Sequence, residues 1–398
     1  MLYIKNAYIK TMEGPDLARG DILVQDGKIV EVGEHVNAPS EATVIDGEGM
    51  FITPGLVDAH SHAGLREDGN KVEGEDVNEI PHSPICPQVR AIDAVNVMDR
   101  AFTEAYENGI TSIVITTGSL NVVGGQAAAI KTCGTCVDNM IIKHPVAVKI
   151  ALGENTKGAY GALQKTPRSR LGIASLLRET LYKAKHYKEA LESADESKRP
   201  PFDLQMEALL PVMRGDIPLK THAHRADDIL TALRIAREFG VKLTLEHCTE
   251  GYLILEEIVK SGFPAVVGPS LMARSKVELK NHSIENAGAL VGAGVKVALT
   301  TDAPVEPLKY LIIEAQLLLR GGLKEEDAWR GMTINPAEII GIDNRVGSLR
   351  KGKDADIVIF TANPLQVVDA YVAMTIMDGK IIYQNTKYMK VITEKATV

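Results

Sequence analysis

Histidine and aspartate residues stand where four apolar, strand-like runs of this sequence end. The first run ends in DAHSH and a later one in KTHAH, so each carries two histidines that are two positions apart. Because alternate residues of a strand point to the same side, two such imidazoles can bind one ion. Two other runs end in LEHC and LTTD. These residues predict a site for divalent metal ions, with the ligands His60, His62, His222, His247 and Asp302.

The elements that must position these ligands are strands that alternate with helices. Between residues 51 and 345, seven apolar runs such as SIVITT and VKLTLEHC are separated by stretches with helical spacing such as ASLLRETLYKAKHYKEALES. Such runs are typical of buried parallel strands. The alternation predicts an α/β fold, a (β/α)8 TIM-like barrel with its active site at the carboxyl ends of the strands. The eighth strand is expected within residues 130–145.

The two ends of the chain differ from this middle part. Residues 1–50 contain short alternating segments such as LYIKNAYIK, and residues 346–398 contain ADIVIF and the hairpin YVAMTIMDGKIIYQN with an Asp-Gly turn. The 398 residues suffice for one large barrel and a small second domain. We therefore expect residues 51–345 to form the metal-dependent catalytic barrel, and residues 1–50 and 346–398 to form the two parts of one small β-sandwich.

The site residues resemble those of the amidohydrolase superfamily, the metal-dependent barrel hydrolases. Its first-strand signature is similar to PGLVDAHSH at 54–62, and its later strand-end ligands are similar to His222, His247 and Asp302. The segment NPAEIIGIDNRVGSLRKGKDADIVIF at 335–360 resembles the return of that superfamily into its small β-sandwich. The resemblance covers nearly the whole chain, and the imidazolonepropionase-like and prolidase-like branches are the nearest.

The resemblance also implies a ligand that bridges two ions, and two residues compete for this role. Many members of the superfamily use a lysine carboxylated by CO2, for which the candidate is Lys149 in PVAVKIALGEN. Strand alternation places Lys149 with small residues on the narrow inner side of the barrel, where a free ammonium would be costly. Glu154 ends the same strand, resembles the glutamate of the acetylglucosamine phosphate deacetylase branch and needs no modification. Both alternatives stay open.

This ligand set predicts hydrolysis of a carbon–nitrogen bond other than a protein peptide bond, in an amide, a dipeptide-like compound or a cyclic amide. The metal, expected to be zinc at one or two ions per chain, would convert water to hydroxide near neutral pH. Asp302 would be the general base, and His224 would either orient the oxyanion or cap a helix. The candidates for binding a small-molecule substrate are Arg66, Tyr160, Arg168, Arg170 and Arg225.

Other functions use the same residues in different ways. A deaminase of an amidine-like ring is the first alternative, and a site with a single metal would favour it. A phosphotriester or lactone hydrolase is the second, because the same hydroxide can attack phosphorus or an ester. The alternative that is not an enzyme is a catalytically silent barrel that serves in binding or assembly.

Composition restricts the partners of the protein. The sequence has a formal net charge of −8 and contains no long run of like charges, so we expect neither nucleic acid nor a membrane surface as a partner. Four cysteines in 398 residues are too few for a disulfide scaffold. The start of the sequence lacks the pattern of a secretory signal, which favours a cytoplasmic location. Homo-oligomerisation is an expectation by analogy with the superfamily.

Overall fold

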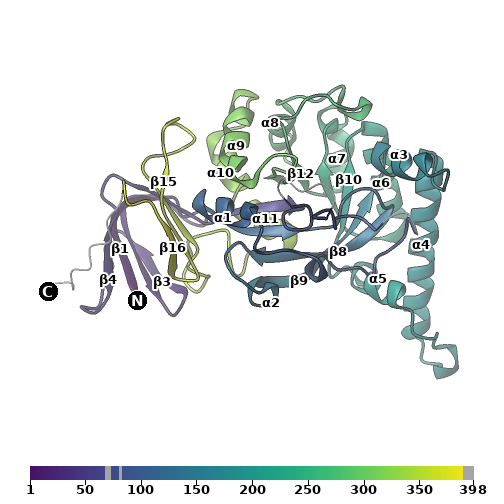
Figure 1. The fold of residues 1–398 in the computed structure, drawn as a ribbon, viewed down its shortest axis with the longest axis horizontal. Coiled ribbons are helices and arrows are strands. Elements are labelled where there is room, and N and C mark those ends of the chain that lie inside the picture. Colours follow the sequence, from purple (N-terminus) through teal and green to yellow (C-terminus); the bar gives the residue numbers. More distant parts are fainter. Residues whose placement is uncertain (68–72, 80–82, 389–398) are drawn as a thin grey trace.

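The computed structural model describes residues 1–67, 73–79 and 83–388. Its strands form two eight-stranded sheets, a terminal sheet and a barrel sheet, which lie side by side (Figure 1). The terminal sheet contains β1 (Leu2–Ile9), β2 (Leu17–Gln25), β3 (Lys28–Gly33), β4 (Thr43–Asp46), β5 (Phe51–Pro54), β14 (Ile357–Phe360), β15 (Val372–Met377) and β16 (Lys380–Gln384). The barrel sheet contains β6 (Leu56–Ser61), β7 (Ile110–Ile115), β8 (Val123–Lys131), β9 (Ile141–Ala151), β10 (Leu219–Ala223), β11 (Leu243–His247), β12 (Ala265–Val267) and β13 (Val297–Leu299).

The terminal sheet joins strands from both ends of the chain, as the sequence predicts. Its order is β16-β15-β14-β5-β1-β2-β3, and β4 pairs with β1. Apolar side chains from both parts, among them Ile4, Ile52 and Ile359, form one buried core. The strand β5 pairs with β1 and β14, so residues 51–54 belong to this sheet and not to the barrel, whose first strand starts two residues later.

The barrel sheet confirms the expected fold class but departs from strict alternation at one place. Five neighbouring pairs are parallel, whereas β8 runs antiparallel to both β7 and β9. The expectation of an eighth strand within residues 130–145 is wrong, because this strand is β8 and spans Val123–Lys131. Residues 130–145 instead hold the end of β8, the short helix α2 (Val137–Met140) and the start of β9. No crossover helix is needed there, because an antiparallel pair can be joined by a short turn.

Helices cover the outside of the barrel (Figure 1). In α6 (Ala226–Phe239), for example, Ile229, Leu233 and Ala236 are buried on one face, and Gly240 ends the helix in the left-handed region, which favours glycine. None of the helices among the described residues is long and apolar enough to cross a membrane. The remaining helices are α1 (Arg100–Glu107), α3 (Glu154–Ala162), α4 (Arg170–Leu191), α5 (Leu204–Arg214), α7 (Leu255–Ser261), α8 (Asn286–Gly292), α9 (Leu311–Arg320), α10 (Glu325–Gly331) and α11 (Ile334–Ile340).

The buried carboxylate of Asp58 joins the first strand of the barrel to the last. Thr300 Oγ1 donates to Asp58 Oδ1 at 2.6 Å, while the backbone N and the Oγ1 of Thr301 donate to Oδ2 at 2.9 and 2.8 Å. The backbone N of His60 also donates to Oδ1, at 3.0 Å. The strands β6 and β13 stand at the two ends of the pairing order. Asp58 therefore fixes the His60 end of β6 against the segment that carries Asp302.

A buried cluster of charges connects the barrel to the terminal sheet. Lys131 Nζ, at the end of β8, lies 2.6 Å from Asp356, 3.1 Å from Asp354 and 3.1 Å from Asp378. Asp354 and Asp356 precede β14, and Asp378 lies in the turn between β15 and β16. Burial alone would raise the pKa of Asp354, but Lys131 and other cations hold it at about 2. This carboxylate is therefore ionised at neutral pH and contributes stability that is lost as the pH falls from about 4 to about 2.

We predict that Lys131→Met destabilises the fold by about 3–5 kcal/mol, because it leaves the buried carboxylate of Asp356 without its cation. Urea unfolding at pH 7 measures the loss. The matched control is Lys183→Met, because Lys183 forms an exposed pair with Glu179, whose loss costs under about 1 kcal/mol. Equal stability of the two variants would show that the cluster does not stabilise the junction.

Candidate metal centre

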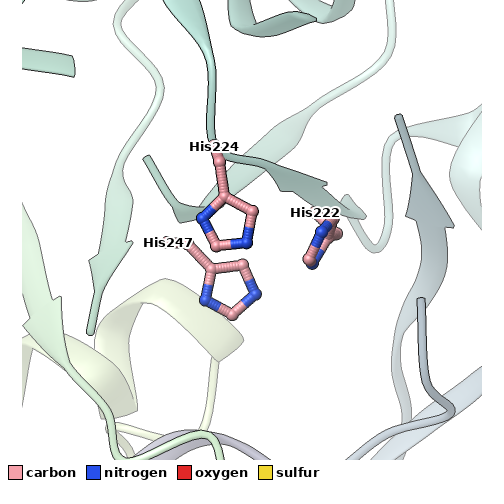
Figure 2. Close-up of side chains that lie close together, drawn as sticks. All are labelled: His222, His224 and His247. Carbon is pink, nitrogen blue, oxygen red and sulfur yellow. The ribbon is translucent and has the colours of Figure 1, made fainter. Parts of the chain in front are cut away.

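Two groups of side chains converge at the carboxyl ends of the barrel strands. His60, His62 and Asp302 form the first group, in which the possible ligand atoms lie within 4.8 Å of one another. His222, His224 and His247 form the second group with the same spacing. Figure 2 shows the second group, in which the rings of His224 and His247 are stacked and the ring of His222 stands edge-on to both. The structure thus brings together every predicted histidine and Asp302.

Hydrogen bonds to the Nδ1 atoms orient the imidazole rings. His62 Nδ1 lies 2.7 Å from Thr116 O, and His247 Nδ1 lies 2.8 Å from Gly268 O. Since a carbonyl oxygen can only accept, both Nδ1 atoms donate, and the Nε2 atom of each neutral ring keeps its lone pair. This arrangement is common for histidines that bind metals, because the second hydrogen bond fixes both the tautomer and the orientation of the ring.

His60 is oriented by a buried carboxylate in the barrel interior. Its Nδ1 donates to Glu246 Oε2 at 2.6 Å, and the same oxygen accepts from Lys220 Nζ at 2.7 Å. Thr244 Oγ1 donates to the other oxygen of Glu246. All four side chains are buried. Glu246 directly precedes His247 in β11, so a single strand supplies one candidate ligand and the residue that orients another.

Burial also sets the charge states of the two groups. It lowers the pKa of His60, His222 and His224 well below the usual value and lowers that of His247 as well. These imidazoles are therefore neutral near pH 7, which is the form that binds metal. Burial alone would raise the pKa of Asp302, but His247 and His62 lower it, so this carboxylate is ionised.

Lys149 lies between the two groups on β9. Its Nζ is 3.0 Å from His60 Nε2, and its charge also lowers the pKa of His222 and His247. The side chain is fully buried, and burial lowers the pKa of Lys149 to about 7. A large fraction of this amine is therefore uncharged at neutral pH.

Glu154, the alternative to Lys149, belongs to neither group. It is the first residue of α3, and its carboxylate accepts from the backbone N of Glu278 at 3.3 Å. Its own backbone N donates to Glu278 Oε2 at 2.9 Å. Tyr160 on the same helix is completely buried; its hydroxyl donates to Ser83 O at 2.7 Å and accepts from Asn121 at 3.1 Å. The structure therefore brings neither Glu154 to the ligand groups nor Tyr160 to a substrate pocket.

Three of the predicted arginines surround one pocket of about 550 Å³, together with Glu154. Arg168 is exposed, whereas Arg170 binds Asp228 at 2.9 Å and Arg225 binds Asp227 at 2.8 Å. Val277, adjacent to Glu278, also lines this pocket. Arg66 lies elsewhere, paired with Glu75 at 3.0 Å and beside Ala303 and Pro304 in another part of the barrel mouth.

The backbone is strained at the ends of two ligand strands. His247, Cys248 and Asp302 have φ values of 64°, 47° and 52°, in the left-handed region that residues other than glycine seldom adopt. Each such residue costs on the order of 1–3 kcal/mol and persists only when the surroundings hold it, which is most common at functional sites. The strain therefore coincides with the candidate ligands His247 and Asp302.

Sequence reasoning missed Glu278, the buried carboxylate nearest to the second group. Its Oε1 lies 3.9 Å from His222 Nε2 and 3.7 Å from His224 Nε2. A long loop separates Glu278 from the end of β12, so Glu278 does not stand at the end of an apolar run. The signal that could have found it is the sequence SKVELK, in which charged residues alternate with small or apolar ones.

The fold and these two groups define an α/β barrel that can hold divalent cations at the carboxyl ends of its strands. The amidohydrolase family profile matches residues 211–382. The crystal structure of an amidohydrolase from Thermotoga maritima MSB8 is 40% identical, with a TM-score of 0.93 over 97% of this chain and all of that chain. The chain therefore belongs to the amidohydrolase family, which confirms the resemblance.

Curated relatives agree with this assignment. The amidohydrolase tasK of Hapsidospora irregularis is 28% identical over 90% of this chain, which spans only 39% of the length of that protein. A dihydroorotase of Aquifex aeolicus (strain VF5) is 25% identical over 96% of this chain and 99% of its own length. Hydrolases that act on carbon–nitrogen bonds are thus among the relatives of this protein.

We predict that Gly268→Ala weakens metal binding by about 10- to 100-fold, the usual effect of losing a group that orients a ligand. A Cβ atom at residue 268 would stand 2.0 Å from Thr300 O, and the φ of this glycine is +131°. The carbonyl that holds His247 must therefore move. Competition with a chromophoric chelator measures the affinity.

The control is Gly262→Ala, because Gly262 also has a positive φ, of +70°, but has no atom within 4 Å of the added Cβ. Equal affinities of the two variants would show that the Gly268 carbonyl does not fix His247.

Proposed function

We propose that this protein hydrolyses a carbon–nitrogen bond in a small amide, a dipeptide-like compound or a cyclic amide, using divalent cations held by the two groups. The observation that carries this proposal is the convergence of five imidazoles, Asp302 and Lys149 within one buried mouth of the barrel. His and carboxylate donors of this kind suit zinc, which is the metal we propose.

The contacts between these side chains support a cation in the first group. Asp302 Oδ1 faces His62 Nε2 at 3.2 Å and His60 Nε2 at 3.4 Å. With Nδ1 as the donor to Thr116 O, the side of His62 that faces Asp302 is Nε2, so the two atoms need a proton or a cation between them. A cation at this position would meet that need. When bound, the cations supply a Lewis acid for the scissile carbonyl and lower the pKa of a water molecule to near neutral.

We propose that Lys149, and not Glu154, takes the bridging position. Only the uncharged amine attacks CO2, and burial already favours this form. The nitrogen lone pair forms a bond to the carbon of CO2 as one C–O π bond breaks, one proton leaves the nitrogen, and the product is a carbamate whose single negative charge is shared by its two oxygens. This reaction turns a buried neutral amine next to His60 into an anion, and cations bound by the two groups would offset the cost of burying that charge.

Asp302 is the residue that we propose to move the proton. Its carboxylate is ionised, lies at the first group and is held by the strained backbone after β13. It can accept a proton from water during attack and then donate it to the leaving nitrogen.

The arginine-lined pocket supports a proposal about the charge of the substrate. It adjoins the second group, since Glu154 lines it and binds Glu278. We propose that Arg168 binds an anionic part of the substrate there, because it has no ion-pair partner among the described residues. An acylated amino acid or a dipeptide would supply such a carboxylate.

Metal analysis of the purified protein, combined with assays on acylated amino acids, dipeptides and cyclic amides, tests this function. We expect about two metals per chain, and turnover that a chelator removes and zinc restores. Turnover that survives complete removal of metal would contradict the proposal. A single metal with release of ammonia would favour the deaminase.

We predict that Lys149→Ala loses most of the second equivalent of metal and nearly all activity, and that added short carboxylic acids restore part of both, because they can occupy the space of the carbamate. Glu154→Ala should retain two metals. The opposite pattern would assign the bridging role to Glu154. Mass spectrometry under conditions that preserve carbamates should show an additional 44 Da, the mass of CO2, on the peptide with Lys149.

Replacement of Asp302 by asparagine keeps the size of the side chain but removes the base. For Asp302→Asn we expect retention of most metal and a decrease in kcat of about 10²- to 10⁴-fold, the usual contribution of a positioned base. A kcat equal to that of the unmodified protein would exclude Asp302 as the proton acceptor.

A further inference from the structure

Glu278 places a second buried carboxylate at the metal centre. It lies in the loop between β12 and α8, and only 1% of the residue is exposed. Its Oε1 faces the Nε2 atoms of His222 and His224, at 3.9 and 3.7 Å. A gap of this size between a carboxylate oxygen and two imidazole nitrogens is too long for hydrogen bonds, and an ion that binds both sides fits it.

Neighbouring groups hold this carboxylate in its orientation. Lys276 Nζ lies 2.7 Å from Oε1, and the backbone N of Glu154 donates to Oε2 at 2.9 Å. Asn155 Oδ1 in turn accepts from Lys276 Nζ at 3.0 Å. An oxygen of a carboxylate has two lone pairs, so Oε1 can accept from Lys276 and still bind a cation. Such hydrogen-bonded partners commonly orient carboxylates that bind metals.

The two groups have the same construction. In each, two histidines separated by one residue leave the end of a strand, and a buried carboxylate from a later loop faces their Nε2 atoms. Asp302 supplies this carboxylate to the first group, at 3.2 and 3.4 Å, and Glu278 supplies it to the second. The second group also contains His247, so it offers four side chains where the first offers three.

We infer that Glu278 and His224 are metal ligands, and that together with His222 and His247 they complete the second cation site. This inference rests on the proposed function. Counted with the bridging Lys149 proposed above, these residues give the second cation five protein ligands, against four at the first, and more than the four at which zinc sites are usually closed. We therefore assign a positioning role to the second cation, and the water that becomes the nucleophile to the side of His60, His62 and Asp302.

Metal titration of the full chain after chelation tests this assignment. We expect the unmodified protein to bind two zinc ions. In Glu278→Gln the second equivalent binds about 100-fold more weakly, because a neutral amide oxygen replaces the carboxylate, while the first equivalent keeps its affinity. In titrations with Co²⁺, the visible absorption of the second equivalent changes as a protein ligand is lost, which is a readout independent of turnover.

The matched control is Glu250→Gln. Glu250 is equally a buried glutamate near the second group, but its two oxygens already accept from the backbone N of Ala226 and from Asn281 Nδ2, both at 2.8 Å. Its replacement leaves both metal affinities unchanged. We expect Glu278→Ala and His224→Ala each to lower the affinity for the second equivalent of metal as Glu278→Gln does. Thermal unfolding of the metal-free proteins tests whether all the variants fold.

The results of these titrations distinguish failure of this ligand assignment from failure of the proposed function. Two equivalents bound to Glu278→Gln with unchanged affinity and cobalt spectrum overturn the role of Glu278 and leave the proposed hydrolase intact. Loss of both equivalents from folded Glu278→Gln also overturns the assignment, since Glu278 would then support the whole centre. If the unmodified protein binds no metal, the proposed function fails before the variants are compared.

Discussion

The site depends on one constraint, which is that lone pairs of imidazole nitrogens and of a carboxylate face one another in a buried space. Burial keeps His60, His222, His224 and His247 uncharged. Hydrogen bonds at Nδ1 turn Nε2 of His62 and His247 toward the same region as ionised Asp302. Acceptors packed so closely are unfavourable without a cation. The rest of the barrel mouth serves to hold this arrangement: Glu246 orients His60, Gly268 orients His247, and the strained backbone fixes the strand ends.

The barrel makes this local arrangement possible because it brings distant segments together. His60 and Asp302 are far apart in sequence, yet Asp58 binds both Thr300 and Thr301 and so fixes one strand end against the other. The buried charges of the site are balanced by partners that the barrel interior supplies, such as Lys220 beside Glu246. The stability of the fold and the geometry of the site therefore depend partly on the same polar contacts.

The sequence was sufficient for the barrel, for the shared terminal domain and for the convergence of the strand-end histidines, because strand periodicity and strand ends are local features. The sequence was insufficient where the structure of a segment depends on its tertiary partners. The run VGGQAAAIK has few large apolar residues, so β8 was not recognised as a strand, and its antiparallel direction depends on the partners β7 and β9. Glu278 was missed because a loop brings it to the site. Tyr160 was misplaced because helix α3 turns its hydroxyl toward Ser83.

The pairing of β5 with β14 has a consequence for biosynthesis. During translation, β1 to β5 emerge first, but the strand that covers the open side of β5 is made only after the entire barrel. Until then Ile52 and its apolar neighbours lack the partners from β14 and β15 with which they share a core. Contacts across so many residues form slowly, and unpaired strand edges favour aggregation. The nascent chain thus carries an incomplete sheet for most of its synthesis, and protection of that edge by a chaperone would matter more for this part of the protein than for the barrel.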